Sequence, residues 1–419
     1  MLPLQPTWLP SAAGLVHRLA SGKPAPAARD AYTQAAAALL HHYPSAAAQQ
    51  LFAPGPAAFL LVSLVLADVR ASLPGLLARL NSPDYADASA RLAAAYDVLS
   101  SFVAHLVSAP DTALAPDHLL KLRAAVADAL SATVGHLRER FDASVAGAAG
   151  LHPDARSGGG DGAAPPAPLA LAWDASSPAH AIGTDPLVLA ALRALGLWLR
   201  EDDAPALRAE AAGLMDVFLA LYASGAPPFR DAVLVALEGV TAASADDEDD
   251  APAPPADPDP DLDAGPDDAV DGAHVFLGHG GFAVLTADVL AILRAPGPGE
   301  AARGIEAVRV LLPIVEASAG AGEEEWLSFV RAVAGWGVPA ADDGGESVTV
   351  VDDFRIAVLQ LATAVLEGAP PGVRRRYARA VSAVVGIAEQ LRRREPSAPE
   401  QTEELDDVLA TLAELRMDA

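Results

Sequence analysis

The sequence contains no cysteine, which excludes disulfide bonds, cysteine-based zinc sites, iron–sulfur clusters and a thiol nucleophile. Aromatic residues make up only 5% of the 419 residues. Alternation of β-branched and polar residues is scarce, and the one strand-like run, Ser347–Val351, is too isolated to imply a sheet. The absence of cysteine also fits a reducing compartment. We therefore expect an intracellular protein with few or no strands.

Basic residues are also few. The chain has 28 Lys and Arg against 55 Asp and Glu, which gives a formal net charge of −27. Twelve of the acidic residues, and no Lys or Arg, lie in Asp246–Asp271, and the rest of the chain is still acidic. A nucleic-acid-binding protein needs a broad basic surface to neutralise phosphates. We therefore expect no nucleic-acid partner.

Long hydrophobic runs are missing as well. The uncharged stretch Ala31–Ala67 is interrupted by Pro44, Pro54 and Pro56, and the remaining piece Ala57–Ala67 is shorter than the ~20 apolar residues that cross a bilayer. The N-terminus has two early prolines and no positively charged region, so it is a poor signal peptide. We expect no integral membrane segment.

What the sequence does contain is helix-forming residues. Hydrophobic residues make up 52% of the chain, and alanine, leucine, arginine and glutamate favour helices. Apolar residues recur three or four positions apart between Pro and Gly breaks, which predicts many amphipathic helices. The expected helices are Ala27–His42, Ala57–Leu73, Ala86–Val107, Asp117–Phe141, Pro186–Arg200, Ala204–Tyr222, Phe229–Ala243, Gly281–Arg294, Glu300–Ala317, Glu323–Ala334, Asp353–Leu366, Gly372–Arg394 and Glu403–Arg416.

Two segments of biased composition divide these helices. One is rich in Gly and Pro, and the other is acidic and studded with proline, so we expect both to be disordered linkers. The predicted organisation is an N-terminal helical array (1–146), a Gly/Pro-rich linker (147–184), central helical repeats (185–244), an acidic disordered insert (245–272), C-terminal helical repeats (273–395) and a linker with a terminal helix (396–419).

Successive amphipathic helices with short connections are typical of an α-solenoid, in which each repeat buries its apolar face against its neighbours. Armadillo and HEAT repeats of ~40–47 residues fit the helix spacing, although no crisp consensus repeats. The predicted fold is therefore an all-α, armadillo/HEAT-like α-solenoid of degenerate helical repeats. The helix Pro186–Arg200 is apolar nearly all round, so we expect neighbours to cover it on several sides.

The sequence contains few candidate motifs for catalysis or metal binding. The sequence has no phosphate-binding loop, nucleophile elbow, zinc-protease motif or dinucleotide fingerprint. Gly278–Phe282 is interpreted as a loop that ends before a helix, and Asp257–Asp263 as a solvated tether without the glycine and glutamate of a calcium loop. The adjacent pair His41–His42 is interpreted as helix-end residues whose rings point apart, and Glu201–Asp203 as a cap for the following helix. We expect no catalytic residue, no metal and no cofactor.

One basic cluster opposes the overall charge. The helix Gly372–Arg394 carries seven arginines: Arg374, Arg375, Arg376, Arg379, Arg392, Arg393 and Arg394. Arginine binds carboxylates with two parallel hydrogen bonds, so one interpretation is a docking surface for an acidic partner. The other is a solvent-facing surface, which could attract the chain's own segment Asp246–Asp271.

Several stretches, in order, resemble the neurochondrin family. Leu187–Asp202 ends in a W-L-x-E corner, and Ala206–Phe218 follows with an L-R-x-E helix. Ala58–Leu73 is similar to that family's F-x-x-L-L-V-x-L-x-x-x-E-V-R helix, and Tyr96–Leu99 and Phe276–Leu285 fall in the expected order.

The resemblance implies an atypical armadillo-like solenoid that is non-enzymatic, mainly cytoplasmic and active through binding signalling proteins. Met1 falls inside the family's pattern, so we expect an N-terminal set of repeats to be absent, which would leave apolar residues free for self-association. The acidic insert departs from the family. The Ala, Arg and Pro bias is typical of a GC-rich genome, such as a fungal one.

The leading hypothesis is thus a protein-binding scaffold that uses solenoid surfaces. Two alternatives stay open. One is an all-α enzyme whose titratable groups converge only in the fold. The other is an acidic chaperone that binds basic proteins through residues 246–271.

Overall fold

The computed structural model describes residues 6–22, 25–77, 84–108, 114–146, 181–242, 271–318, 324–338, 346–394 and 399–417. All regular elements in these ranges are helices, which confirms the all-α prediction. The helices group into two compact units, one made of α1–α11 and the other of α12–α19. The expected linker 147–184 and acidic insert 245–272 lie outside the described residues, apart from 181–184 and 271–272.

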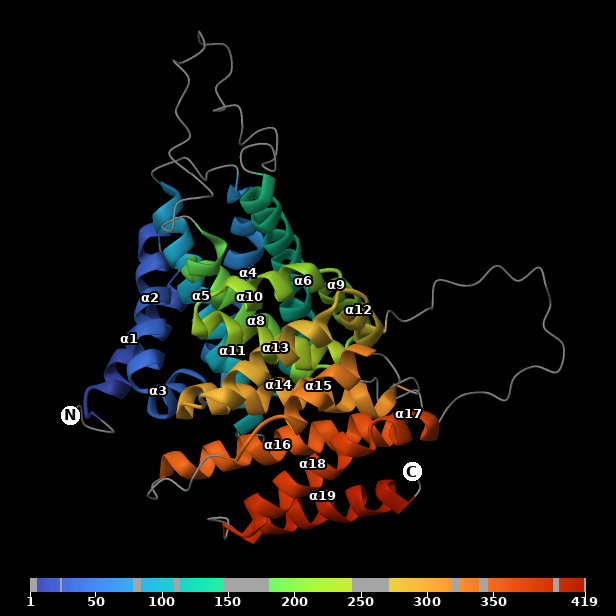
Figure 1. Ribbon diagram of the computed structural model, residues 1–419. Helices are drawn as coiled ribbons and strands as arrows, with labels where there is room; N and C mark the ends of the chain where they lie inside the picture. Colours follow the sequence, from blue (N-terminus) through green and yellow to red (C-terminus); the bar gives the residue numbers. More distant parts are fainter. Residues whose placement is uncertain are drawn as a thin grey trace, which may run out of the picture. The chain divides into compact units, whose positions relative to one another are not determined.

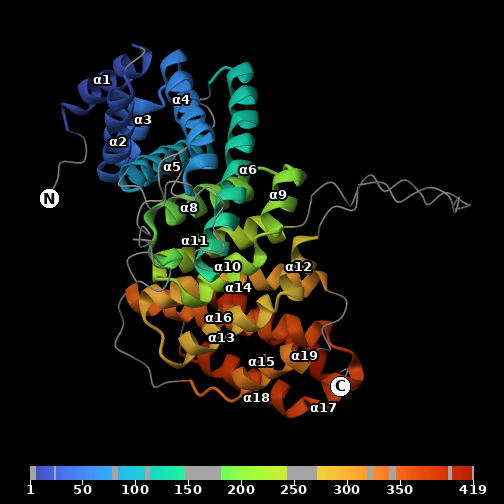
Figure 2. The same ribbon diagram turned by 90° about the horizontal axis from the view of Figure 1, so that it is seen from above.

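Unit 1 contains the N-terminal and central helices. They are α1 (Leu9–Ser21), α2 (Pro26–His42), α3 (Pro44–Leu51), α4 (Pro56–Ser72), the 3₁₀ turn η1 (Leu73–Gly75), α5 (Asp84–Ser108), α6 (Pro116–Ala146), η5 (Ile182–Thr184), α8 (Pro186–Glu201), α9 (Pro205–Ala212), α10 (Met215–Ser224) and α11 (Pro227–Thr241). Figure 2 shows α1, α2, α3 and α4 grouped at the N-terminal end of this unit.

Proline explains where many of these helices begin. Pro26, Pro44, Pro56, Pro116 and Pro186 each occupy the first position of a helix. A proline fits there because its missing N–H would have no partner inside the helix and its fixed φ is already helical. Within the described residues, proline therefore starts helices more often than it interrupts them.

The core of unit 1 forms around α5 and α8. The helix α5 packs on α2, α4 and α8, and a buried hydrogen bond of 2.6 Å joins the Tyr96 hydroxyl to Thr133 Oγ1 on α6. Ten residues of α8 are buried, as the sequence predicted for a helix that is apolar on all sides. On a further side, Gly196 and Gly239 let α8 and α11 approach so closely that an added Cβ would lie within 3 Å of the other backbone.

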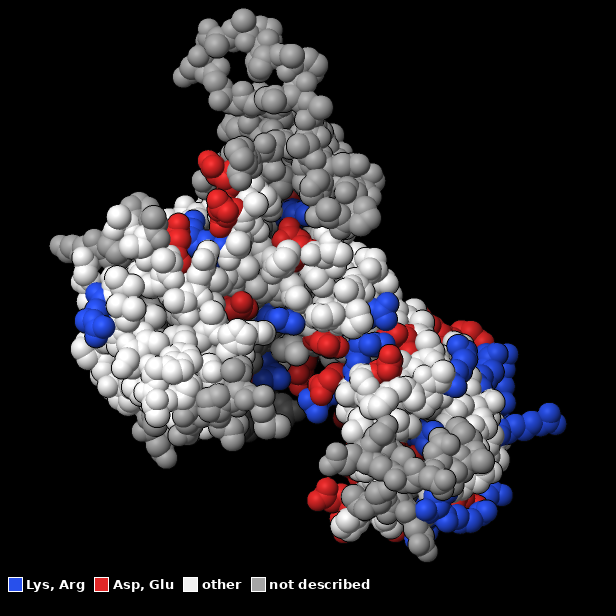
Figure 3. All heavy atoms as spheres, turned by 90° about the vertical axis from the view of Figure 1, so that its left-hand side faces the viewer, with Lys and Arg blue, Asp and Glu red and all other residues white. Residues whose placement is uncertain are grey.

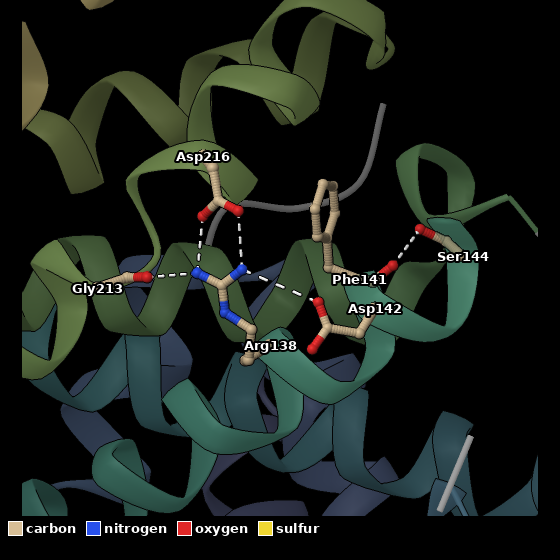
Figure 4. A network of polar contacts seen from close by, with 6 residues as sticks. All are labelled: Arg138, Phe141, Asp142, Ser144, Gly213 and Asp216. Atoms are coloured by element: carbon tan, nitrogen blue, oxygen red, sulfur yellow. Dashed lines mark hydrogen bonds and ion pairs between the residues drawn. The ribbon is translucent and has the colours of Figure 1, made fainter. Parts of the chain in front are cut away.

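An ionic bridge fixes α6 to the junction of α9 and α10 (Figure 4). Arg138 on α6 donates two hydrogen bonds to Asp216, at 2.8 and 2.7 Å, and a third to the carbonyl oxygen of Gly213. The expected single helix Ala204–Tyr222 is therefore wrong: it breaks at Gly213–Leu214, where Arg138 replaces the lost helical partner of the Gly213 carbonyl.

Unit 2 contains the C-terminal helices. They are α12 (Gly272–Gly278), α13 (Gly281–Arg294), α14 (Pro298–Ala317), α15 (Glu324–Ala334), α16 (Glu346–Gly368), α17 (Pro371–Arg376), α18 (Ala378–Arg392) and α19 (Pro399–Met417). In Figure 1, α14, α16, α18 and α19 lie one beneath the next, and each of these neighbouring pairs is in contact. This stacking of successive helices is the packing expected of an α-solenoid.

Unit 2 corrects two expectations. The strand-like run Ser347–Val351 is the first turn of α16, because the long apolar pattern that follows outweighs local β propensity. The expected single helix Gly372–Arg394 is interrupted at Tyr377, which separates α17 from α18. The Tyr377 side chain is buried and its hydroxyl accepts a 2.6 Å hydrogen bond from Arg331 on α15, so a tertiary contact accompanies this break.

Two helices of unit 1 are long and apolar enough to cross a membrane by length and composition alone. They are Pro56–Gly75, which joins α4 to η1, and Asp84–Ser108, which is α5. The first of these extends beyond the uncharged piece Ala57–Ala67 and includes the charged residues Asp68 and Arg70, as the expected helix Ala57–Leu73 does. An ion pair between Asp68 and Arg91 links these two helices.

Candidate functional site

The predicted arginine surface lies on two consecutive helices of unit 2. Arg374–Arg376 form the last turn of α17, and Arg379 lies in the first turn of α18. Arg392 is the last residue of α18, and Arg393 and Arg394 follow it. Figure 3 shows basic side chains gathered at its lower right, where the C-terminal helices of unit 2 lie. The structure therefore brings most of this set to the surface.

The seven arginines are not equivalent. Arg392 forms an ion pair of 2.8 Å with Asp406 on α19, and Arg393 forms one of 2.8 Å with Glu389. Among the described residues, no carboxylate lies within ion-pair distance of Arg375, Arg376 or Arg379, whose side chains are exposed. Like charges that crowd together without counter-charges attract an anionic group.

A second candidate site is an apolar groove in unit 1, which sequence reasoning did not identify. It has a volume of about 340 Å³. Two helical stripes line it, one on the C-terminal part of α5 and one on the N-terminal part of α6, together with the last turn of α8. The lining residues are Phe102, Val103, Leu106, Val107, Leu119, Leu120, Leu122, Arg123, Val126, Trp198, Glu201 and Asp202.

The charged residues of the apolar groove come from α6 and from the end of α8. Arg123 lies 2.7 Å from Asp202 and 3.9 Å from Asp203. The Asp202 side chain is only 9% exposed, whereas those of Arg123 and Asp203 are 54% and 71% exposed. The second carboxylate oxygen of Asp202 is buried without a hydrogen-bond partner in the described part of the chain.

This arrangement corrects the interpretation of Glu201–Asp203 as a helix cap. The N-cap of α9 is Ala204, and no side chain caps that helix. Asp202 instead holds Arg123, 79 positions earlier in the chain. The sequence contains no separate signal for the groove, because adjacent apolar residues on one helix, such as Phe102 and Val103, can also both be buried.

The other sequence candidates have structural roles. Gly280 has a left-handed φ of 72° and precedes α13, as expected, although the short helix α12 before it was not predicted. His41 and His42 end α2 as expected, but the prediction that their rings point apart is wrong: the ring centroids are 5.1 Å apart, edge to face. The run 257–263 lies outside the described residues.

The side chains with strongly shifted pKa lie inside unit 1 and do not line the apolar groove. Burial, reinforced by the positive charge of Arg140, lowers the pKa of His136 to about 4. Burial, reinforced by the negative charge of Asp185, raises the pKa of Tyr85 to about 12. Within the described ranges, no three His, Asp or Glu side chains are grouped as metal ligands. The groove thus combines apolar walls with one cluster of charged residues, which is the composition of a binding surface.

Two comparisons with known proteins bear on these sites. The family model described as Neurochondrin matches residues 3–232, more than half of the chain. The match covers nearly all of unit 1, including the apolar groove, and stops before the arginine surface. No curated protein sequence matches the chain.

Proposed function

The chain belongs to the neurochondrin family, and from this we propose that it is a non-enzymatic, cytoplasmic scaffold that docks signalling or regulatory proteins on the surfaces of its stacked helices. Neurochondrin is not known as an enzyme family. The stacked helices of each unit support the proposal, because such arrays expose long faces that recognise other proteins without a catalytic centre.

The observation that carries the proposal furthest is the group of exposed arginines without carboxylate partners, Arg375, Arg376 and Arg379, with Arg374 beside them. These arginines lie outside residues 3–232, so the family match does not extend to them. In a chain with a net charge of −27, such a cluster favours an acidic protein segment, which arginine can bind bidentately.

The test is binding of a fluorescent peptide made of alternating Glu and Asp to the full chain, measured by anisotropy. Changing Arg374, Arg375, Arg376 and Arg379 to Glu should weaken binding by about tenfold or more, because attraction becomes repulsion. Binding to the unchanged protein should also fall as salt is raised. Proximity labelling with both forms then asks whether the set of bound proteins changes.

A matched control makes the same change in net charge elsewhere. Arg29, Arg193, Arg294 and Arg309 are exposed and lie on four different helices, α2, α8, α13 and α14. Their change to Glu should leave peptide binding much less affected. If the two quadruple variants bind alike, or the labelled set of proteins is unchanged, the arginine surface is only solvent-facing. Deleting residues 246–270 tests the chain's own acidic segment as a competitor, since its removal should then strengthen peptide binding.

A further inference from the structure

The apolar groove of unit 1 is a separate feature that the proposed use of the arginine surface leaves unexplained. Its two main walls come from consecutive helices, and its residues follow helical spacing: Phe102, Val103, Leu106 and Val107 on α5, then Leu119, Leu122 and Val126 on α6. The volume of about 340 Å³ is within the range of ligand-binding clefts. Apolar stripes from two helices, with space between them, form a groove of the kind that accepts an amphipathic helix.

Exposure distinguishes this groove from a packing defect in the core. Val107 is 50% exposed and Leu120 is 65% exposed, and both belong to the lining. These are among the few large apolar side chains that the described part of the chain leaves in solvent. The apolar lining therefore continues from the buried residues Phe102 and Trp198 out to the protein surface, as in a site that a partner covers.

The charged residues at the groove indicate which kind of partner fits. Glu201, Asp202 and Asp203 follow one another at the C-terminus of α8, where the helix dipole adds negative charge. Arg123 faces Asp202 and Asp203, and Arg200 pairs with Glu201. Asp203 remains 71% exposed, and Arg123, the one cation within ion-pair distance of it among the described residues, is 3.9 Å away. Its carboxylate is therefore accessible to a further cation.

We propose that the apolar groove binds an amphipathic helix of a partner protein, which inserts large apolar side chains between α5 and α6 and places a Lys or Arg beside Asp203. The carboxylates favour this occupant over a fatty acid, whose anionic head group would meet three acidic residues and a guanidinium that already binds two of them. The site lies within the residues that match the family model, and it does not depend on the arginine surface.

The test uses two synthetic fluorescent peptides of about four helical turns. Both carry the same stripe of Leu and Phe, and one ends in two lysines where the other ends in two glutamates. In anisotropy titrations with the full chain, the lysine peptide should bind about tenfold or more tighter. Asp203→Asn should reduce this preference, because it removes the exposed carboxylate and leaves the apolar walls intact.

Leu120→Asp should weaken binding of the lysine peptide by about tenfold or more, because it places a charge in the lining. Val145→Asp is the matched control: Val145 lies on the same helix, is 72% exposed and is not part of the groove. Both variants should unfold at the temperature of the unchanged protein, since both positions are exposed. The quadruple Arg→Glu variant of the arginine surface should bind the lysine peptide normally.

Four results would overturn the proposal. The first is equal binding of the lysine and glutamate peptides, and the second is binding that Leu120→Asp leaves unchanged. The third is displacement of the lysine peptide by oleate, which would identify an acyl-chain site. The fourth is self-association of the unchanged protein that Leu120→Asp abolishes in sedimentation experiments, which would identify a second copy of the chain as the occupant.

Discussion

Single residues in the interior of unit 1 combine roles that no local pattern reveals. Asp185 accepts a 3.0 Å hydrogen bond from the backbone N–H of Leu187 and thereby caps α8. The same carboxylate forms a 3.2 Å ion pair with Arg140, which is only 1% exposed. The sequence Asp185-Pro186 is a recognisable helix start. Its buried cation, 45 positions earlier on α6, is visible only in the fold.

His136 lies in the same interior and makes the stability of unit 1 sensitive to acid. Its pKa is lowered to about 4 in the folded protein, first by burial and then by Arg140, while an unfolded chain would protonate it near its ordinary value of 6.5. Below that ordinary value the unfolded state binds more protons. Stability therefore falls as the pH drops from 6.5 to about 4, and His136 causes no further loss below that.

His136→Gln should reduce this acid sensitivity. Between about pH 7.5 and about pH 5, the unchanged protein should lose about 2 kcal/mol of unfolding free energy through His136, and the variant should not lose it. Denaturant unfolding at both pH values measures the difference. His42→Gln, at an exposed position that ends α2, serves as the control and should keep the full loss. Equal losses in His136→Gln and the unchanged protein would contradict the assignment.

Local sequence signals predict where most of the helices lie, but they do not predict which helices contact one another. Proline at the first position and apolar spacing located most helices to within a few residues, for example α13 at Gly281–Arg294. The breaks at Gly213 and Tyr377 were missed because distant side chains, Arg138 and Arg331, contact them. The apolar groove was missed because its walls are brought together by the packing of α5, α6 and α8.

The close approach of α8 and α11 can be tested by substituting the two glycines that permit it. A Cβ on Gly196 would lie 2.8 Å from the backbone nitrogen of Ala236, and one on Gly239 would lie 2.6 Å from the Leu199 Cβ. Gly196→Ala and Gly239→Ala should each lower the unfolding free energy by about 1–3 kcal/mol, since backbone atoms cannot move aside as flexible side chains do. Thermal or denaturant unfolding of the full chain provides the measurement.

Gly135 on α6 is the matched control, because an added Cβ there has no other heavy atom within 4 Å. Gly135→Ala should raise the unfolding free energy by up to about 1 kcal/mol, since alanine favours the helix and restricts the unfolded chain. A gain for Gly196→Ala similar to that for Gly135→Ala would show that α8 and α11 do not need the close contact.

For the chain as a whole, hydropathy and packing give different answers on whether two of its helices belong in a membrane. The apolar helices Pro56–Gly75 and Asp84–Ser108 meet a membrane criterion by length and composition. In the fold, they bury residues such as Leu61, Val65 and Phe102 against other helices of unit 1. Their linking ion pair, Asp68–Arg91, is half-buried at the arginine and would be costly to place in lipid.

We therefore expect the purified chain to remain in the aqueous fraction when it is floated with neutral lipid vesicles on a density gradient. The buried apolar stripes are already satisfied by protein contacts, and the strong negative charge of the chain gives no attraction to lipid head groups. Recovery of the protein with the floating vesicles would instead indicate that α4 and α5 leave unit 1 and enter the bilayer.

The sequence by itself determined the helical class and most helix positions, because propensity, proline placement and apolar spacing act within a few residues. The order of its motifs also identified the family. Only the tertiary structure decided which side chains meet. Arg123 and Asp202 are 79 positions apart, and Arg138 and Asp216 are 78 apart. Such pairs depend on how whole helices pack, and no local pattern encodes that packing. The apolar groove and the ion pair of Arg392 with Asp406 on α19 arise in the same way.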